Sequence, residues 1–175
     1  MLIEMEVSGL TVDPGSNTPI VLLREKSGER VLPIWIGVVE ASAIAFELEQ
    51  MKRNRPMTHD LLKNMVESLG GEVEKVSVVG LRDNTYYAQI VVSQNEKAIE
   101  IDSRPSDAIA LALRARAPIF CDSEVVARTS DAEETETATE RPADDGPRPI
   151  FSTEHEDLNA LLEGLEPEDF GKYKM

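Results

Sequence analysis

Large apolar side chains are absent from one long segment near the C-terminus of this 175-residue sequence. Residues 129–149 contain acidic residues, Thr, Ala and three prolines, but no large apolar side chain. Such a segment cannot bury enough apolar surface to offset the entropy lost on folding. We therefore predict one domain over residues 1–128, a flexible acidic linker over 129–149, and an acidic tail over 150–175. Leucines at helical spacing between Leu158 and Leu165 predict a short amphipathic helix in the tail.

Negative charge is concentrated in the same C-terminal part. Residues 1–128 contain 14 Lys and Arg against 19 Asp and Glu, whereas residues 129–175 contain 4 against 14. The total of −15 therefore divides into −5 for the domain and −10 for the remainder. Phosphate backbones bind clustered Lys and Arg, and a domain at −5 can still carry a local basic patch. The charge therefore does not exclude DNA or RNA as a partner.

The sequence also bears on compartment and redox state. Cys121 is the only cysteine, so no internal disulfide can form. The N-terminus lacks the basic and apolar regions of a secretory signal, and no stretch approaches the ~20 apolar residues that cross a bilayer. We expect a cytoplasmic protein with no membrane partner.

The apolar pattern of the domain alternates between strand-like and helix-like segments. Short apolar runs separated by Gly, Asn, Asp and Ser turns predict strands near residues 2–12, 19–24, 30–36, 73–79, 86–92, 98–101 and 118–121. Apolar residues at helical spacing predict helices that begin near Glu40, Thr58 and Arg104. The sequence predicts an α+β fold in which three main helices pack on a mostly antiparallel sheet of about six to seven strands.

A first polar cluster, residues 55–60, precedes the second helix. Pro56 ends the preceding helix, Thr58 is the predicted N-cap, and Asp60 lies in the first turn. Together with Arg55, this helix N-terminus suits a phosphate, and His59 can transfer a proton near neutral pH. Simple helix capping with His59 on the surface explains the same residues, so both interpretations stay open.

A second polar cluster, residues 102–107, lies between a strand and the third helix. Asp102 and Asp107 can share Mg²⁺ or Mn²⁺, Glu40 can add a further metal ligand, and Arg104 can hold a phosphate. The alternative is structural: Arg104 pairs with an aspartate, while Ser106 or Asp107 caps the helix.

Other reactive side chains have simpler interpretations. Trp35, the only tryptophan, is predicted to be a core or interface residue rather than a stacking platform. Ser106 has no obvious partner base, which argues against a serine hydrolase. We expect Cys121, on an apolar strand, to be inert.

Three separated blocks of this sequence resemble the bifunctional nuclease domain family. They are Leu32-Pro33-Ile34-Trp35-Ile36-Gly37 with Glu40-Ala41, Arg55-Pro56-Met57-Thr58-His59-Asp60-Leu61, and the block from Asp102 to Arg114. Their order and spacing also agree, over about residues 1–127. The resemblance implies an α+β domain that tends to self-associate, and the family takes its name from members that degrade both DNA and RNA.

Two functions follow as hypotheses. The first is a nuclease acting on DNA and RNA with little sequence specificity, in which a divalent cation assists. Its predicted catalytic residues are His59, Asp60, Asp102 and Asp107. Its predicted substrate-binding residues are Arg55, Arg104 and Ser106, and its predicted metal ligands are Asp102, Asp107 and Glu40. The second hypothesis is a non-catalytic anion-binding, regulatory or oligomerisation module that uses the same clusters.

Overall fold

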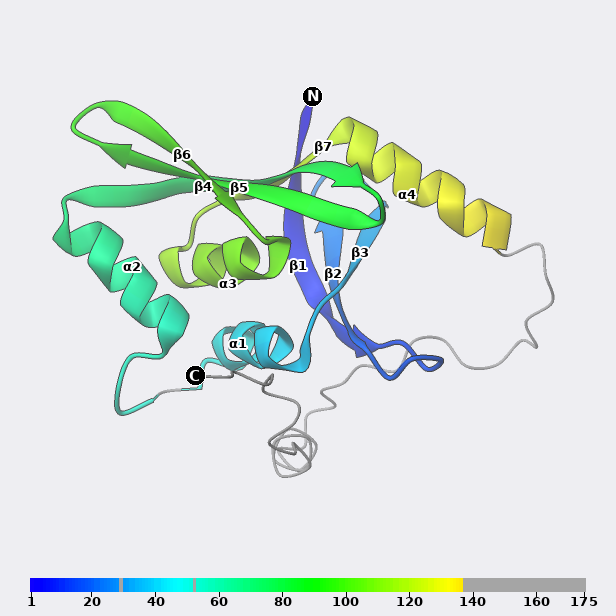
Figure 1. Cartoon of the computed structure of the whole chain (residues 1–175), viewed down its shortest axis with the longest axis horizontal. Helices are drawn as coiled ribbons and strands as arrows, with labels where there is room; N and C mark the ends of the chain where they lie inside the picture. The colour runs from blue at the N-terminus through cyan, green and yellow to red at the C-terminus, as the bar shows by residue number, and fades with distance from the viewer. Residues whose placement is uncertain (29, 52, 137–175) are drawn as a thin grey trace.

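The computed structural model describes residues 1–28, 30–51 and 53–136. Within them the chain forms one seven-stranded sheet and four α-helices (Figure 1), which confirms the predicted α+β class. The strands are β1 (Leu2–Val12), β2 (Pro19–Glu25), β3 (Val31–Trp35), β4 (Gly71–Arg82), β5 (Thr85–Gln94), β6 (Lys97–Ser103) and β7 (Ile119–Asp122). The helices are α1 (Val38–Leu48), α2 (Thr58–Ser68), α3 (Pro105–Ala115) and α4 (Ser123–Glu136).

Two antiparallel meanders, β1–β2–β3 and β4–β5–β6, make up most of the sheet. The strand order is β3-β2-β1-β7-β4-β5-β6. β7 pairs antiparallel with β1 and parallel with β4, so a short late strand joins the two meanders. Each meander leads into a helix, α1 after β3 and α3 after β6. This connection brings the beginnings of two helices from distant parts of the sequence into one region.

The hydrophobic core draws on both meanders and on three helices. Val21, Leu32, Ile44, Val76 and Ile109 are each at most 1% exposed and belong to one cluster. The interior of α3 is buried on nearly all sides, which agrees with its mostly apolar composition. The sheet also curls, so that the Tyr86 hydroxyl on β5 can donate a hydrogen bond to the Pro33 carbonyl on β3, near the opposite end of the strand order (3.4 Å).

Helices α1, α2 and α3 lie together on one side of the β4–β5–β6 meander, whereas α4 lies apart from them beside β3, β4 and β7 (Figure 1). α2 differs from its neighbours because it contains no buried residue. Most of its large apolar side chains, together with that of the C-cap residue Leu69, are exposed to solvent: Leu61, Leu62, Met65 and Leu69. Val66 of α2 packs against the core cluster, but it is only partly buried. Because α2 has so little apolar packing, its polar contacts contribute strongly to its attachment to the domain.

Two local predictions are corrected by the structure. Thr58 is the first residue of α2 rather than its N-cap, because Met57 takes that position and its N–H donates to the Asp60 carboxylate (2.8 Å). α4 crosses the predicted boundary at residue 128 and continues to Glu136, with Thr129 buried and bonded to the Val125 carbonyl (3.0 Å). The remaining linker and the tail, including its predicted leucine helix, lie outside the described residues. No described helix is long and apolar enough to span a membrane.

Candidate active site

Each of the three helices on this side carries a carboxylate at its third residue: Glu40 on α1, Asp60 on α2 and Asp107 on α3. A negative charge in the first turn is favourable because it faces the positive end of the helix dipole. Each carboxylate also forms an ion pair with an arginine from the start or end of α3, either Arg104 or Arg114. Two arginines therefore connect three helix N-terminal turns.

Arg104 joins α3 to α1. It is the N-cap residue of α3, and Pro105 fixes the first helical position after it. Its Nε donates to Asp107 Oδ2 and its Nη1 donates to Glu40 Oε1, both at 2.7 Å. These bonds raise the pKa of Arg104 further, so the guanidinium stays charged. Its side chain is still 64% exposed, and Nη2 has no hydrogen-bond partner among the residues described.

His59 connects α2 to the same carboxylate. Its Nε2 lies 3.0 Å from Asp107 Oδ1, and its side chain is only 12% exposed. Burial raises the pKa of Asp107, but the hydrogen bonds from Arg104 and His59 outweigh burial and bring this pKa below its ordinary value. Asp107 is therefore ionised at neutral pH, and its Oδ1 accepts a hydrogen bond from Nε2–H of His59. The pairing fixes the orientation of the imidazole ring.

One cavity of about 370 Å³ between the three helices is lined by four of these side chains: Glu40, His59, Arg104 and Asp107. Much of the remaining wall of this cavity is apolar and includes the side chains of Val39, Ala43, Phe46 and Met57. A partly apolar cavity in which a few charged groups converge is the usual form of an active site. We name it the His59 cavity.

Arg114 ties the same helices together from the other end of α3. Its side chain is 5% exposed, and it donates to Asp60 Oδ1 (2.6 Å), to the Ala110 carbonyl (2.8 Å) and to the Ala43 carbonyl (3.0 Å). Burial raises the pKa of Asp60, but the Met57 N–H and Arg114 outweigh it and lower this pKa. Because both oxygens of Asp60 are engaged, its contacts are those of a structural residue.

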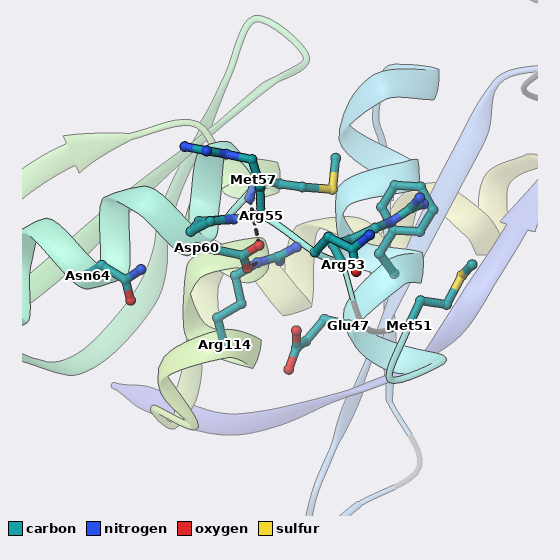
Figure 2. A pocket seen from close by; sticks show the side chains of 11 residues that line it. Glu47, Met51, Arg53, Arg55, Met57, Asp60, Asn64 and Arg114 are labelled. Atoms are coloured by element: carbon teal, nitrogen blue, oxygen red, sulfur yellow. Dashed lines mark hydrogen bonds and ion pairs between the residues drawn. The ribbon is translucent and has the colours of Figure 1, made fainter.

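The Asp60–Arg114 pair lies in a second cavity, of about 260 Å³, shown in Figure 2. We name it the arginine cavity, because Arg53 and Arg55 also line it. The Arg53 guanidinium lies over the Phe46 ring, 4.1 Å from its centre. Arg55 is exposed and forms no ion pair with any residue that the structure describes. Phe46, Met57 and Arg114 line both this cavity and the His59 cavity, so the two adjoin.

A third cavity, of about 290 Å³, adjoins the His59 cavity on the side of Arg104. We name it the Trp35 cavity. Glu40 and Arg104 line both cavities, and the third also contains Trp35, Tyr86 and the buried Ser106. The three cavities therefore adjoin one another, with the His59 cavity between the other two.

Comparison with known proteins identifies the family. The sequence model of the bifunctional nuclease domain matches residues 21–134, which is most of the chain. This chain belongs to the bifunctional nuclease domain family. All residues that line the three cavities fall inside the matched range of the bifunctional nuclease domain.

Relatives of two kinds match the chain. An uncharacterized protein of Mycobacterium tuberculosis is 37% identical over 170 residues, which cover 95% of this chain and 97% of the relative. Bifunctional nuclease 1 of Arabidopsis thaliana is 32% identical over 110 residues, and bifunctional nuclease 1 of Oryza sativa subsp. japonica is 28% identical over the same length. Those matches cover 61% of this chain but only 34% and 33% of the plant proteins.

The structure distributes the predicted site residues of this bifunctional nuclease domain unequally. Glu40, His59, Arg104 and Asp107 converge, whereas Arg55 and Ser106 line the adjoining cavities. Asp102 is exposed on β6 and lines none of the three cavities.

The predicted metal ligands do not assemble. No group of three or more His, Cys, Asp or Glu residues in the described part of the chain could hold a metal ion. Glu40 and Asp107 bind the Arg104 guanidinium instead, and the other oxygen of Asp107 faces His59. This arrangement does not fit a divalent cation, because cationic or N–H groups already engage these carboxylates. Metal assistance stays a prediction.

Phe46, Met57 and Arg114, which line both the His59 cavity and the arginine cavity, were not among the predicted site residues, and neither was Arg53. For Arg114 a signal existed, because a charged residue that follows an almost entirely apolar helix needs a partner.

Proposed function

We propose that this chain is a nuclease that hydrolyses phosphodiester bonds in DNA and RNA with little sequence preference, and that the His59 cavity is its active site. The observation that carries the proposal is the His59–Asp107 pair beside the exposed, charged Arg104. The names of the plant relatives support the same reaction class.

His59 acts as the general base in this proposal. Its Nε2 is held by Asp107, and Nδ1 has no hydrogen-bond partner among the described residues. Nδ1 is therefore the nitrogen that can accept a proton from an attacking water molecule. Ionised Asp107 stabilises the imidazolium that forms, as a positioned carboxylate does beside a catalytic histidine.

Arg104 binds the scissile phosphate. Nη2 of its guanidinium is unpaired within the described structure, and the exposed side chain faces the cavity that contains His59. A fixed guanidinium can stabilise the charge that develops on the phosphoryl oxygens. Glu40 and Asp107 keep it in position by binding its other two nitrogens.

A broad substrate range follows from the groups that are available to bind the substrate next to the active site, which are arginines. Arg53 and Arg55 in the adjoining arginine cavity can bind flanking phosphates, which are the same in every nucleotide sequence. Such contacts discriminate neither between bases nor between DNA and RNA. These contacts support a nuclease with little sequence preference. In this proposal Arg55 binds a flanking phosphate rather than the scissile one.

A comparison of two aspartates tests the proposal. We expect Asp107→Asn to lower the rate of hydrolysis of labelled single-stranded DNA and RNA by about 10²-fold or more. Asp102→Asn, which lies outside the three cavities, should have a much smaller effect, and Glu72→Gln on β4 is the control for removal of an exposed carboxylate. Measurement in Mg²⁺, in Mn²⁺ and in a chelator tests the predicted metal dependence separately. Wild-type activity of Asp107→Asn would overturn the assignment of the site.

A specific observation favours a second candidate function, that of an oligomerisation module. The exposed leucines of α2 and the largely exposed edge strand β6, with Ile99 and Ile101 each 43% exposed, form surfaces suited to another copy of the chain. We propose a homo-oligomer on this basis. Sedimentation velocity of wild type and of Leu61→Lys is the test, and a wild-type monomer over a wide concentration range would contradict it.

A further inference from the structure

Trp35 is exposed although tryptophan is the largest apolar side chain. It is the last residue of edge strand β3, and 52% of its surface remains accessible to solvent. Of the two predicted environments, core or interface, the structure excludes the core for Trp35, and an interface stays a prediction. Leaving half of an indole in water forgoes a substantial hydrophobic stabilisation, since aromatic rings contribute strongly when they are buried. The ring is thus available to a partner.

The surroundings of Trp35 indicate what kind of partner. The Trp35 cavity also contains the polar side chains of Asn84 and Thr85 and the guanidinium of Arg104. Arg104 is the same residue that we assign to the scissile phosphate. A group bound in this cavity would therefore lie next to a phosphate bound at Arg104.

We infer that the Trp35 cavity accepts one unstacked base of a single-stranded nucleic acid, with Trp35 as its stacking platform. This inference rests on the proposed function and adds the substrate class, single strands. A base in a duplex is already stacked and paired, so it has no free face for the indole ring.

The size and chemistry of the cavity agree with this occupant. Its volume of about 290 Å³ is at the lower limit of ~300–1,000 Å³ for whole-ligand cavities, which suits one base with the remainder of the strand outside. Stacking on an aromatic ring tolerates any base, because every base has a π face. It also ignores the 2′-hydroxyl, so stacking on Trp35 is compatible with both DNA and RNA.

The test uses the fact that Trp35 is the only tryptophan of the chain. Its fluorescence therefore reports on this cavity alone. The probe is a short phosphorothioate oligothymidylate, which resists hydrolysis, and a base-free oligomer with the same number of phosphates is its control. A duplex of the same length is the third ligand, and all three are compared at one salt concentration.

Variants separate stacking from general apolar contact. Binding measured by fluorescence anisotropy should be 5- to 150-fold weaker for Trp35→Leu, the range expected for loss of one base–aromatic stack of about 1–3 kcal/mol. Trp35→Phe should retain most of the affinity, because it keeps a flat ring. Tyr87→Leu removes another exposed ring, on β5 and outside the three cavities, and should bind like wild type. Far-ultraviolet circular dichroism confirms that each variant is folded.

The outcomes distinguish the alternatives. Saturable quenching by oligothymidylate but not by the base-free oligomer, together with weak binding by Trp35→Leu, supports the inference. Equal quenching by both oligomers, unchanged binding by Trp35→Leu, or tighter binding of the duplex overturns it. Emission that changes with protein concentration alone also overturns it, because Trp35 would then lie between copies of the chain. Quenching without hydrolysis of an ordinary oligonucleotide would refute the proposed nuclease activity but not the stacking role of Trp35. Hydrolysis without quenching would refute the stacking role but not the nuclease activity.

Discussion

Replacing Arg114 with methionine should destabilise the domain and loosen α2. Arg114 is the buried partner of three oxygen atoms, one on each of α1, α2 and α3. Methionine retains much of the side-chain length and its apolar packing, so the substitution removes mainly these hydrogen bonds. Because α2 has no buried residue of its own, the loss should affect that helix most.

The magnitude follows from burial. Removing one partner of a fully buried ion pair costs about 3–5 kcal/mol. Asp60 is 32% exposed, so water can partly rehydrate its carboxylate, and we expect a somewhat smaller loss of about 2–4 kcal/mol in the free energy of unfolding. For a domain of this size the corresponding fall in Tm is roughly 6–20 °C.

Urea denaturation of Arg114→Met, Asp60→Asn and the double variant measures the effect. We expect a coupling energy of about 1–3 kcal/mol between the two residues. Lys63→Met is the matched control, because it removes the cation of an exposed pair with Glu67 on the same helix and should cost less than about 0.5 kcal/mol. A change in Arg114→Met as small as that of the control would refute the reasoning. Amide exchange that is no faster in α2 than in wild type would show that Arg114 does not hold this helix.

Three further predictions concern acid stability, thiol reactivity and phosphate binding. The folded-state pKa values of Asp60 and Asp107 are lowered, so these two carboxylates stabilise the folded domain fully above about pH 4, and this stabilisation is lost as the pH falls through the folded values. The urea midpoint of wild type should therefore decrease between pH 5 and pH 3. The decrease should be smaller in Asp60→Asn. Burial and then the neighbouring carboxylate raise the pKa of Cys121 to about 12, so iodoacetamide at pH 8 should alkylate it only after unfolding, as mass spectrometry would show. Arg55→Ala should raise KM several-fold at unchanged kcat and reduce the salt dependence of binding by about one phosphate contact, whereas a fall in kcat alone would contradict a flanking role.

The local elements of the fold were predictable from the sequence because their signals are local. Alternating apolar residues and turn-forming residues define the strands, and Pro105 marks the start of α3. The position of β7 between β1 and β4 was not predictable, because it depends on parallel pairing between segments far apart in the chain. α4 was missed for a different reason: Val125, Val126 and Thr129 are its only buried residues among those whose burial is described, which is too weak a pattern to recognise.

The candidate site was predictable only in part. Polar residues at helix starts identified Glu40, His59, Arg104 and Asp107, and the structure gathers these four. Both interpretations of the second cluster contributed, because Arg104 does pair with an aspartate and yet remains exposed. Asp102 was grouped with these four residues because it is close to Arg104 in the sequence. It belongs to β6, however, so its side-chain direction is set by the strand pairing opposite Gln89 and not by the start of α3.

In the proposed mechanism, His59, held by Asp107, transfers the proton during hydrolysis. The most direct measurement is the single-turnover rate at which His59→Gln cleaves a labelled single-stranded oligonucleotide, with enzyme in excess and at neutral pH. We expect a rate about 10²- to 10⁴-fold below wild type, with oligonucleotide binding largely retained. A rate within a few fold of wild type in a folded variant would contradict it.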